Sequence, residues 1–262
     1  MMKCVLSIAG SDASGGAGVQ ADLKTFMGHK VYGMCAITAL TAQNTKGVQG
    51  IEGVRPEFLK LQLESVFTDI YPDAVKIGMT GTGPNAQVIA EMLEVYPVKS
   101  VVIDPVMVST SGSTLLLDSA REIYEGRLLP MADLITPNIP EAEVLSGIKI
   151  DSEKSMEKAA DALALKYNTN ILIKGGHFAS SSSDLLCLQG GRLIWYPMER
   201  IETQNTHGTG CTLSSSLAAN LAYGFSLEDA VLKSKIYITG LLKDEINLGD
   251  GNGPLNHAGA GR

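Results

Sequence analysis

The sequence predicts an α/β protein: one mostly parallel central sheet with helices on both faces and an antiparallel hairpin near the C-terminal edge. Three observations predict it. Short apolar runs alternate with longer amphipathic stretches almost from end to end. The short runs are rich in Val and Ile without polar alternation, which is typical of strands buried on both faces. The order strand, helix, strand favours right-handed crossovers and therefore a parallel sheet.

The expected strands recur from residue 4 to residue 196. They are Cys4–Ala9, Met34–Leu40, Ala74–Ile77, Val101–Asp104, Leu134–Thr136, Ile171–Lys174, Asp184–Leu188 and Arg192–Tyr196. The last two are separated by Gln189-Gly190-Gly191. Such a short glycine turn predicts that these two strands form an antiparallel hairpin.

The amphipathic stretches predict the helices that cover this sheet. They are Ala17–Gly28, Pro56–Asp69, Asn85–Tyr96, Ser119–Leu129, Pro140–Ser146, Glu153–Tyr167, Thr209–Ala222 and Leu227–Glu245. No internal repeat, linker or shift of composition divides the chain. We therefore expect a single domain over residues 1–262.

Size and composition exclude several classes of protein. Among 262 residues, Lys plus Arg number 21 and Asp plus Glu 28, so the formal charge is −7. This acidic balance argues against a nucleic-acid binder or a membrane-surface protein, but it allows anionic small molecules. No apolar run approaches the ~20 residues of a membrane span. The four cysteines form no C-x-x-C pair, which favours reduced thiols and a cytoplasmic location.

The first candidate ligand site is the glycine-rich segment Gly10–Gly18, between the first strand and the first helix. Small residues let the backbone approach a ligand and turn its amides inward. Gly16–Ala21 fits a dinucleotide fingerprint, but the acidic residue that this fingerprint requires is missing from residues 36–44. A nicotinamide enzyme is therefore disfavoured, and no Gly-Lys-Ser/Thr indicates a Walker loop. A tight turn without a ligand is the alternative.

A second segment of small residues, Asn205–Thr212, leads into the expected helix Thr209–Ala222. Its glycines leave the amides of the first turn uncovered, which predicts an anion site at a helix start. Cys211 lies in that positive field, and we expect the field to lower the pKa of its thiol toward neutrality. The alternative is a small buried cysteine at a helix start.

Polar side chains follow three further strands. Asp104 ends a Val-Val-Ile strand and suits Mg²⁺ or a metal-bound water, although a turn cap explains it too. Asn138 and Glu141 form an N-x-x-E at a strand-to-helix junction, which helix capping alone also explains. Lys174 ends a buried strand and needs an anionic partner, for which a phosphate is a candidate.

The histidines form no metal cluster, and no G-x-S-x-G motif indicates a serine hydrolase. We expect loop or surface positions for His29, His177, His207 and His257. An anion-binding helix start, a lysine, a carboxylate for a divalent metal and an N-x-x-E together describe phosphoryl transfer. That chemistry depends mainly on positioning and on the neutralisation of charge.

The ordered set of motifs resembles the hydroxymethylpyrimidine/phosphomethylpyrimidine kinases, which are thiamine-biosynthesis enzymes of the ribokinase-like fold. The matching segments are Gly10–Gly18 with Ala21-Asp22, Ala39–Thr45, Lys76–Met79, Asp104–Met107, Thr136–Asn138, Lys174–His177 and His207–Cys211. The match runs from Ser7 to His257, and its order makes the set specific. It implies a cytoplasmic homodimer that uses ATP and Mg²⁺ to convert 4-amino-5-hydroxymethyl-2-methylpyrimidine to its monophosphate and then to the diphosphate.

The resemblance also implies roles for single residues. The substrate pocket would be formed by Gly10, Asp22, Gln43, Met79 and Val106. In it, the Gln43 amide would pair with the ring nitrogen and the amino edge, and Met79 would stack on the ring. The ATP phosphates and Mg²⁺ would face Asn138, Glu141 and Lys174, with Asp104 near the metal and Asp184 on the nucleotide side.

The transferred phosphoryl group would lie in an anion hole formed by Gly208, Thr209 and Gly210. Sugar kinases of this fold usually place an aspartate base where this chain has Cys211. We therefore hypothesise that Cys211 helps to deprotonate the hydroxymethyl oxygen in the first step. The second nucleophile is a phosphate, which is anionic and needs no base.

The main alternative inside the family is a pyridoxal kinase. Some pyridoxal-using relatives carry a second cysteine in the flap after the D-P-V strand, whereas this chain has Ser109–Gly112, which favours the pyrimidine. We expect this flap to close over the site and exclude water. A non-catalytic vitamin-binding module is disfavoured because Asp104, Glu141, Lys174 and the segment Gly208–Cys211 are all present.

Overall fold

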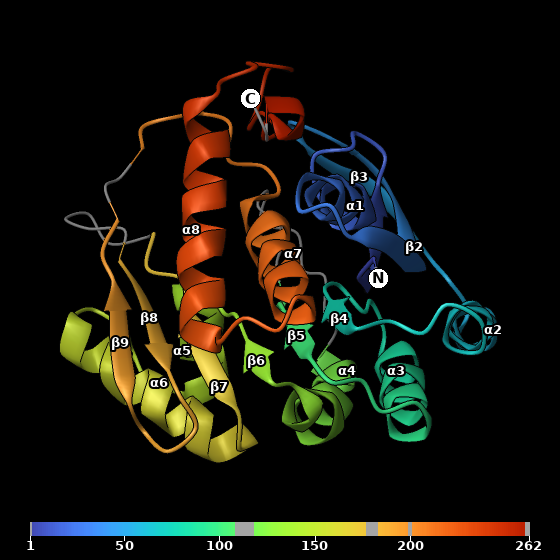
Figure 1. Ribbon diagram of the computed structural model, residues 1–262, viewed down its shortest axis with the longest axis horizontal. Coiled ribbons are helices and arrows are strands. Elements are labelled where there is room, and N and C mark those ends of the chain that lie inside the picture. Colours follow the sequence, from blue (N-terminus) through green and yellow to red (C-terminus); the bar gives the residue numbers. More distant parts are fainter. Residues whose placement is uncertain (1, 108–117, 177–182, 199–200, 260–262) are drawn as a thin grey trace.

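One nine-stranded sheet runs through the computed structural model, which describes residues 2–107, 118–176, 183–198 and 201–259 (Figure 1). The strand order is β3-β2-β1-β4-β5-β6-β7-β8-β9. The strands are β1 Cys4–Asp12, β2 Tyr32–Asn44, β3 Gly47–Gly53, β4 Ala74–Ile77, β5 Val101–Ile103, β6 Leu134–Ile135, β7 Asn170–Ile173, β8 Asp184–Cys187 and β9 Leu193–Tyr196.

The centre of this sheet is parallel and its two edges are antiparallel. From β2 through β1, β4, β5 and β6 to β7, every neighbouring pair is parallel. β3 is antiparallel to β2, and β8 and β9 form an antiparallel extension beyond β7. The turn between β8 and β9 contains Gly190 and Gly191 at φ +101° and +86°, a conformation that glycine adopts without strain. The predicted mixed sheet and its hairpin are confirmed.

Helices cover both faces of the sheet. The helices are α1 Gly18–Gly28, α2 Pro56–Phe67, α3 Gly83–Val95, α4 Asp118–Ile123, α5 Ile139–Ser146, α6 Glu153–Tyr167, α7 Thr209–Ala222 and α8 Leu227–Lys243. One face packs against α1, α7 and α8, and the other against α2, α3, α5 and α6 (Figure 1). None of the helices within the described residues is both long enough and apolar enough to cross a membrane.

The Val- and Ile-rich strands follow from this double covering. On β1, Val5 belongs to the core under α1, α7 and α8, whereas Leu6 and Ile8 belong to the core on the opposite face. All three side chains are fully buried. Successive strand residues point to opposite faces, so a strand covered on both sides has no position for a polar side chain facing water.

Two elements differ in kind from the prediction, and β1 and β2 extend past their predicted ends at Ala9 and Leu40 to Asp12 and Asn44. β3 was not expected, because Gly47–Gly53 is glycine-rich and largely exposed and so lacks the hydrophobic alternation of a strand. The strand forms because it pairs in antiparallel fashion with the end of the long strand β2. The single helix expected over Ser119–Leu129 is a short α4 followed by a π-helical turn at Tyr124–Leu128 and a 3-10 turn at Leu129–Met131. Pro130 lacks the N–H that a longer ladder would need.

The carboxyl ends of the parallel strands all lie on one side of the molecule, and the loops that follow these strands gather there. The segments that follow β1, β4, β5 and β7 lie on this side, together with the loop that leads into α7. In open parallel sheets this is where ligands bind. The functional site is therefore expected at the carboxyl ends of the strands.

Candidate functional site

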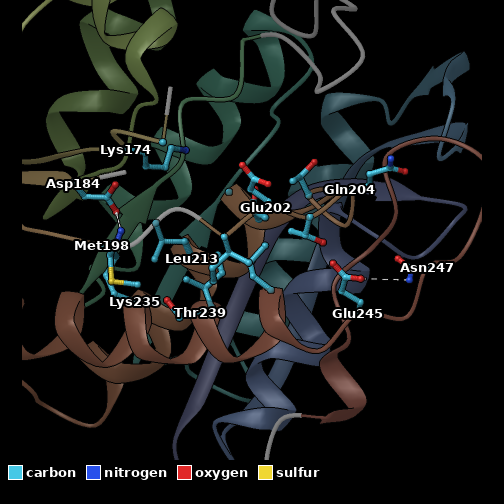
Figure 2. Close-up of a pocket in the computed structure, with 18 residues that line it drawn as sticks. Lys174, Asp184, Met198, Glu202, Gln204, Leu213, Lys235, Thr239, Glu245 and Asn247 are labelled. Carbon is cyan, nitrogen blue, oxygen red and sulfur yellow. Dashed lines mark hydrogen bonds and ion pairs between the residues drawn. The ribbon is translucent and has the colours of Figure 1, made fainter. Parts of the chain in front are cut away.

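Two cavities meet at the carboxyl edge of the sheet. The first, which we call the β1 cavity, measures about 800 Å³ and lies over the ends of β1, β2, β4 and β5. The second, the α8 cavity, measures about 1020 Å³ and lies against α8 (Figure 2). Each is in the size range of small-molecule sites. Both are lined by Lys174, Gly176, Thr206, Thr209 and Gly210, so these residues form a common wall.

Most of the site residues expected from the sequence line the β1 cavity. They are Gly10, Gln43, Met79, Asp104, Val106, Asn138, Glu141, Lys174, Gly208, Thr209, Gly210 and Cys211. A side chain at residue 10 would crowd Met79, because a Cβ there would lie 3.3 Å from the Met79 sulfur. The cavity therefore places one thioether against a wall of backbone, which suits a flat ring.

Asp22 does not line the β1 cavity, contrary to the substrate-binding role expected for it. Its side chain is fully buried, and its two oxygens lie 2.9 and 2.8 Å from the Nζ of Lys76. The hydroxyls of Ser7 and Ser215 also donate to it, at 2.5 and 2.7 Å. Asp22 is thus part of the floor below the cavity, and Lys76, which does line the cavity, is the residue that it holds.

Lys76 was not singled out by sequence reasoning. The one available signal was a lysine inside the apolar strand Ala74–Ile77, which is rare unless the charge is paired. Burial alone would lower the pKa of Lys76, but the Asp22 carboxylate outweighs that and raises it. The Lys76 ammonium in the floor of the cavity therefore stays protonated, paired with the Asp22 carboxylate.

The start of α7 forms the common wall. Gly208 has φ +83°, and a Cβ there would lie 1.9 Å from the carbonyl oxygen of Gly16, so only glycine fits. Gly208 provides no side-chain cap. The Thr209 amide donates to the Thr206 carbonyl oxygen at 3.3 Å, and the Gly210 amide in the same first turn is available to a ligand anion. At Gly210, a Cβ would lie 3.2 Å from Asp104 Oδ2 and 3.4 Å from Lys174 Nζ. Helix start, lysine and carboxylate converge as the sequence indicates.

The anionic partner of Lys174 is a protein side chain. Its Nζ lies 2.7 Å from Asp104 Oδ1, and the hydroxyl of Thr136 donates to the same oxygen at 3.2 Å. Burial alone would lower the pKa of Lys174, but Asp104 and then Glu141 outweigh it and raise it. Lys174 therefore stays charged beside the first turn of α7, where a phosphate would also meet it.

Asn138 and Glu141 form a complete capping box at the start of α5. The Asn138 amide donates to Glu141 Oε2 at 2.8 Å, and the Glu141 amide donates to Asn138 Oδ1 at 2.9 Å. Burial raises the pKa of Glu141 to about 7, although Lys174 partly opposes this. The structural role expected for this N-x-x-E is present, and the same carboxyl faces the β1 cavity.

The acidic residues suit a divalent cation that arrives with other ligands. Within the described residues, no group of three or more His, Cys, Asp and Glu side chains could hold a metal ion by itself. Asp104 and Glu141 nevertheless supply two carboxyl groups at the same cavity. Mg²⁺ is commonly bound by one or two carboxylates plus substrate phosphates and water, so this donor set fits it.

The thiol of Cys211 differs from the expectation. Its burial raises its pKa to about 11, and Asp22 and Asp104 add to the increase. The Lys76 ammonium and a hydrogen bond from the Gly18 amide act in the opposite direction but do not outweigh burial. The prediction that the field of α7 brings this pKa toward neutrality is wrong, because it neglected the cost of burying a thiolate.

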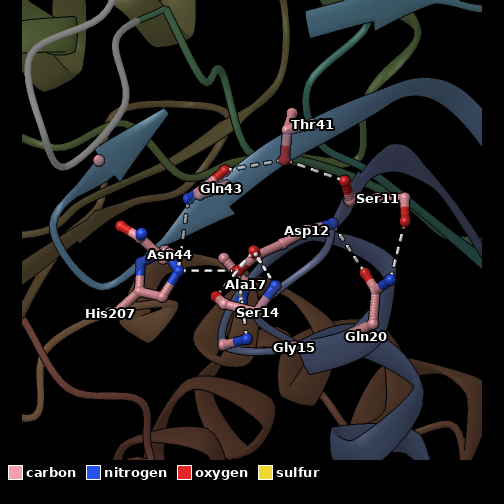
Figure 3. Close-up of polar contacts among 12 residues, drawn as sticks. Ser11, Asp12, Ser14, Gly15, Ala17, Gln20, Thr41, Gln43, Asn44 and His207 are labelled. Atoms are coloured by element: carbon pink, nitrogen blue, oxygen red, sulfur yellow. Dashed lines mark hydrogen bonds and ion pairs between the residues drawn. The ribbon is translucent and has the colours of Figure 1, made fainter. Parts of the chain in front are cut away.

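A hydrogen-bonded network at the β1 cavity joins the ends of β1 and β2 to the loop before α7 (Figure 3). His207 Nε2 lies 2.8 Å from Asp12 Oδ2 and 3.4 Å from Gln43 Nε2. The Thr41 hydroxyl lies 3.0 Å from both Gln43 Oε1 and the Ser11 carbonyl oxygen. His207 lies in the loop before α7, which is one of the two positions expected for it, but it is buried, with only 5% of its surface exposed. A lone histidine beside glycine carried no signal of this partnership.

The α8 cavity has a mixed lining (Figure 2). Asp184, expected on the nucleotide side, lies here; it accepts a hydrogen bond from the Gly175 amide at 2.9 Å and pairs with Lys235 at 2.6 Å. Leu213 and Ile238 supply apolar surface. The Thr239 hydroxyl is buried and has no hydrogen-bond partner among the described residues. Such a group is available to a ligand.

The flap expected at Ser109–Gly112 lies outside the described residues, within 108–117.

The chain is similar in sequence and in fold to known kinases. Residues 12–256 match the family model of phosphomethylpyrimidine kinase. A hydroxymethylpyrimidine/phosphomethylpyrimidine kinase of Haemophilus influenzae is 45% identical over 98% of this chain and 97% of its own. The crystal structure of phosphomethylpyrimidine kinase from Clostridium difficile superposes with a TM-score of 0.81 at 45% identity, covering 90% of this chain and 98% of that one. The pyridoxal kinase of Staphylococcus aureus, in complex with AMP-PCP and pyridoxal, superposes with a TM-score of 0.90 at 34% identity, covering 100% and 96%.

We expect alkylation of Cys211 by iodoacetamide to accelerate about tenfold per pH unit from pH 7 to 9.5, with no plateau. The thiolate reacts, and a group with a pKa of about 11 is still almost fully protonated over this range. Mass spectrometry of the peptide that contains Cys211 measures the rate separately from the other cysteines. The Cys211→Ala variant is the control for peptide assignment, and a plateau near pH 7–8 would contradict the raised pKa.

Proposed function

Because this chain belongs to the phosphomethylpyrimidine kinase family, we propose that it phosphorylates 4-amino-5-hydroxymethyl-2-methylpyrimidine with ATP and then converts the monophosphate to the diphosphate, in thiamine biosynthesis. The observation that carries this proposal is the common wall of the two cavities. A phosphoryl group that leaves a donor bound in one cavity would reach an acceptor bound in the other by passing Lys174, Thr209 and Gly210. Phosphoryl transfer requires such an in-line meeting of donor and acceptor.

The β1 cavity is the proposed acceptor site. A 4-aminopyrimidine presents a ring nitrogen that accepts and an amino group that donates, and the Gln43 carboxamide offers the complementary donor and acceptor. Met79, with Gly10 and Val106, would hold the flat ring. The hydroxymethyl oxygen would then face the start of α7, on the side of Cys211.

The α8 cavity is the proposed donor site. Its apolar side chains and the unpartnered Thr239 hydroxyl suit a nucleoside, with Asp184 and Lys235 at its border. The triphosphate would extend toward the common wall. There the amides of Gly208, Thr209 and Gly210, together with Lys174, would stabilise the charge of the migrating phosphoryl group, which is the main task of a kinase site.

Asp104 and Glu141 would hold Mg²⁺ together with the phosphates of the nucleotide. The ion supplies neutralisation of phosphate charge when bound. Asn138 contributes by fixing Glu141 through the capping box. Lys174 occupies one oxygen of Asp104, which leaves the second oxygen, on the side of Gly210, available.

Cys211 is the proposed proton acceptor of the first step. Because burial raises its pKa to about 11, the thiol must first release its own proton to solvent, and only the resulting thiolate can accept the proton of the hydroxymethyl group. Two groups favour the thiolate: the Lys76 ammonium and the Gly18 amide. The hydroxymethyl group needs this help because a neutral alcohol is a weak nucleophile, whereas the phosphate that reacts in the second step does not.

The proposal includes a homodimer and a cytoplasmic location, both of which rest on the family resemblance. Sedimentation velocity of the purified protein tests the first: a single boundary at twice the mass of the 27.7 kDa chain is expected, and a monomer would contradict it.

Coupled release of ADP tests the reaction itself. We expect the protein to turn over the hydroxymethylpyrimidine and its monophosphate with a kcat/KM at least about tenfold above that for pyridoxal, because the Gln43 edge matches an aminopyrimidine. Heat-denatured protein is the control for contaminating kinases. Turnover of pyridoxal alone would show that the β1 cavity serves the other acceptor of the family.

A large side chain placed in the α8 cavity should weaken the binding of ATP and leave the binding of the pyrimidine unchanged. We expect Thr239→Trp to raise the KM for ATP at least about tenfold and to leave the KM for the pyrimidine within about twofold, because Thr239 lines only the α8 cavity. Ile236→Trp is the matched control, since Ile236 lies on the exposed side of the same helix at 64% exposure. A rise in the KM for the pyrimidine instead would reverse the assignment of the cavities.

Removing the thiol should separate the two steps. We expect Cys211→Ala to slow phosphorylation of the hydroxymethylpyrimidine about 100-fold, the scale of lost base catalysis, and to leave phosphorylation of the monophosphate within about twofold. Cys4→Ala, at the far end of β1, is the control. Each step is measured alone with its own acceptor, and an equal loss in both would exclude the proposed role.

A further inference from the structure

In the network that joins Asp12, His207, Gln43 and Thr41, the contacts outnumber the protons that can be donated. The Thr41 hydroxyl is 3.0 Å from two oxygens, Gln43 Oε1 and the Ser11 carbonyl, but a hydroxyl has one proton to donate. At the other end, His207 Nε2 lies between the Asp12 carboxylate and the Gln43 nitrogen. These contacts determine which way the Gln43 carboxamide points.

The proton of the imidazole is fixed by Asp12. Burial alone would raise the pKa of Asp12, but hydrogen bonds from His207, Ser14 and the Ala17 amide outweigh it and lower the pKa to about 2. An ionised carboxylate only accepts hydrogen bonds. The contact of 2.8 Å between Asp12 Oδ2 and His207 Nε2 therefore requires a proton on Nε2, whether the ring is neutral or charged.

A protonated Nε2 cannot accept a hydrogen bond from the Gln43 nitrogen. If the carboxamide turns by 180°, its oxygen faces Nε2–H and its nitrogen faces the Thr41 hydroxyl oxygen. Thr41 then donates its one proton to the Ser11 carbonyl and accepts from Gln43. The Nε2 proton, which Asp12 accepts at 2.8 Å, is shared with the Gln43 oxygen at 3.4 Å as the longer branch of a bifurcated hydrogen bond. Exchange of the amide nitrogen and oxygen leaves the shape of the side chain unchanged.

We propose that His207, held by Asp12, is a positioning residue that fixes the Gln43 carboxamide with its oxygen toward the imidazole and its nitrogen toward Thr41. Both flanks of the carboxamide are then occupied, and its outer edge presents an acceptor on the side of His207 and a donor on the side of Thr41. This inference rests on the proposed function and specifies how the acceptor is recognised.

The fixed edge accounts for the direction in which the substrate lies. The amino group of the pyrimidine would meet the Gln43 oxygen on the side of His207, and its ring nitrogen would meet the Gln43 nitrogen on the side of Thr41. The hydroxymethyl group is on the carbon next to the amino carbon. It is therefore turned toward Gly208, the residue after His207 and the N-cap of α7.

A pair of acceptors tests this inference. The 4-oxo analogue of the hydroxymethylpyrimidine carries a ring N–H and a carbonyl, and so reverses the hydrogen-bonding pattern at the same shape. The measured quantity is the ratio of kcat/KM for the 4-amino acceptor to that for the 4-oxo acceptor. We expect a ratio of about 100 or more for the unmodified protein, because a fixed amide leaves two mismatched contacts with the analogue.

His207→Leu removes the proton that orders the amide, and we expect the ratio to fall at least about tenfold. His207→Gln retains an N–H that can reach Asp12 and Gln43, and we expect it to preserve the ratio. His29→Asn is the matched control, because His29 bonds Ser216 at the far end of α1, and its ratio should not change. If both substitutions at residue 207 slow the two acceptors equally, His207 has only a structural role and the inference is wrong.

Thr41→Val provides a second route if His207→Leu does not fold. It removes the oxygen that accepts from the Gln43 nitrogen, and we expect the same fall in the ratio; an unchanged ratio would overturn the inference. The outcomes also separate this inference from the proposed function. Turnover of the 4-amino acceptor with an unaltered ratio in the variants contradicts the inference alone. Failure of the unmodified protein to phosphorylate that acceptor contradicts both.

Discussion

The close approach of two loops is the constraint on which the site depends. The backbone of Gly208 lies so near the carbonyl oxygen of Gly16 that no side chain fits between them, and His207 reaches across the same contact to Asp12. This contact joins the starts of α1 and α7. Contacts within the chain itself thereby hold the wall of the β1 cavity and the first amides of α7 next to one another.

Buried charges are arranged around this unit in pairs. Lys76 and Asp22 lie below the β1 cavity, and Lys174 and Asp104 lie at its junction with the α8 cavity. Each lysine keeps its charge because a carboxylate offsets the cost of burial. Cys211 lies near both pairs, and its thiol stays protonated because burial and two carboxylates outweigh the nearby ammonium. Pairing therefore decides which groups near the reaction centre are charged.

The architecture could be predicted from the sequence because burial on both faces leaves a direct pattern of apolar strands, and α6 and α7 have the predicted bounds. β3 could not be predicted, because it forms through pairing with β2 and its own composition does not favour a strand. Most site residues follow from motifs at strand ends. Asp22, His207 and the pKa of Cys211 do not, because each depends on partners distant in sequence and on depth below the surface.

The common wall has a consequence for how this scaffold acquires new acceptors. Lys174, Thr209 and Gly210 line both cavities, so a substitution there alters the two cavities together. The opposite wall, around Met79 and Val106, touches only the β1 cavity. Substitutions there can therefore reshape the β1 cavity and leave the lining of the α8 cavity unchanged. This modularity is consistent with a pyridoxal kinase of Staphylococcus aureus that shares the backbone at a TM-score of 0.90 with only 34% identity.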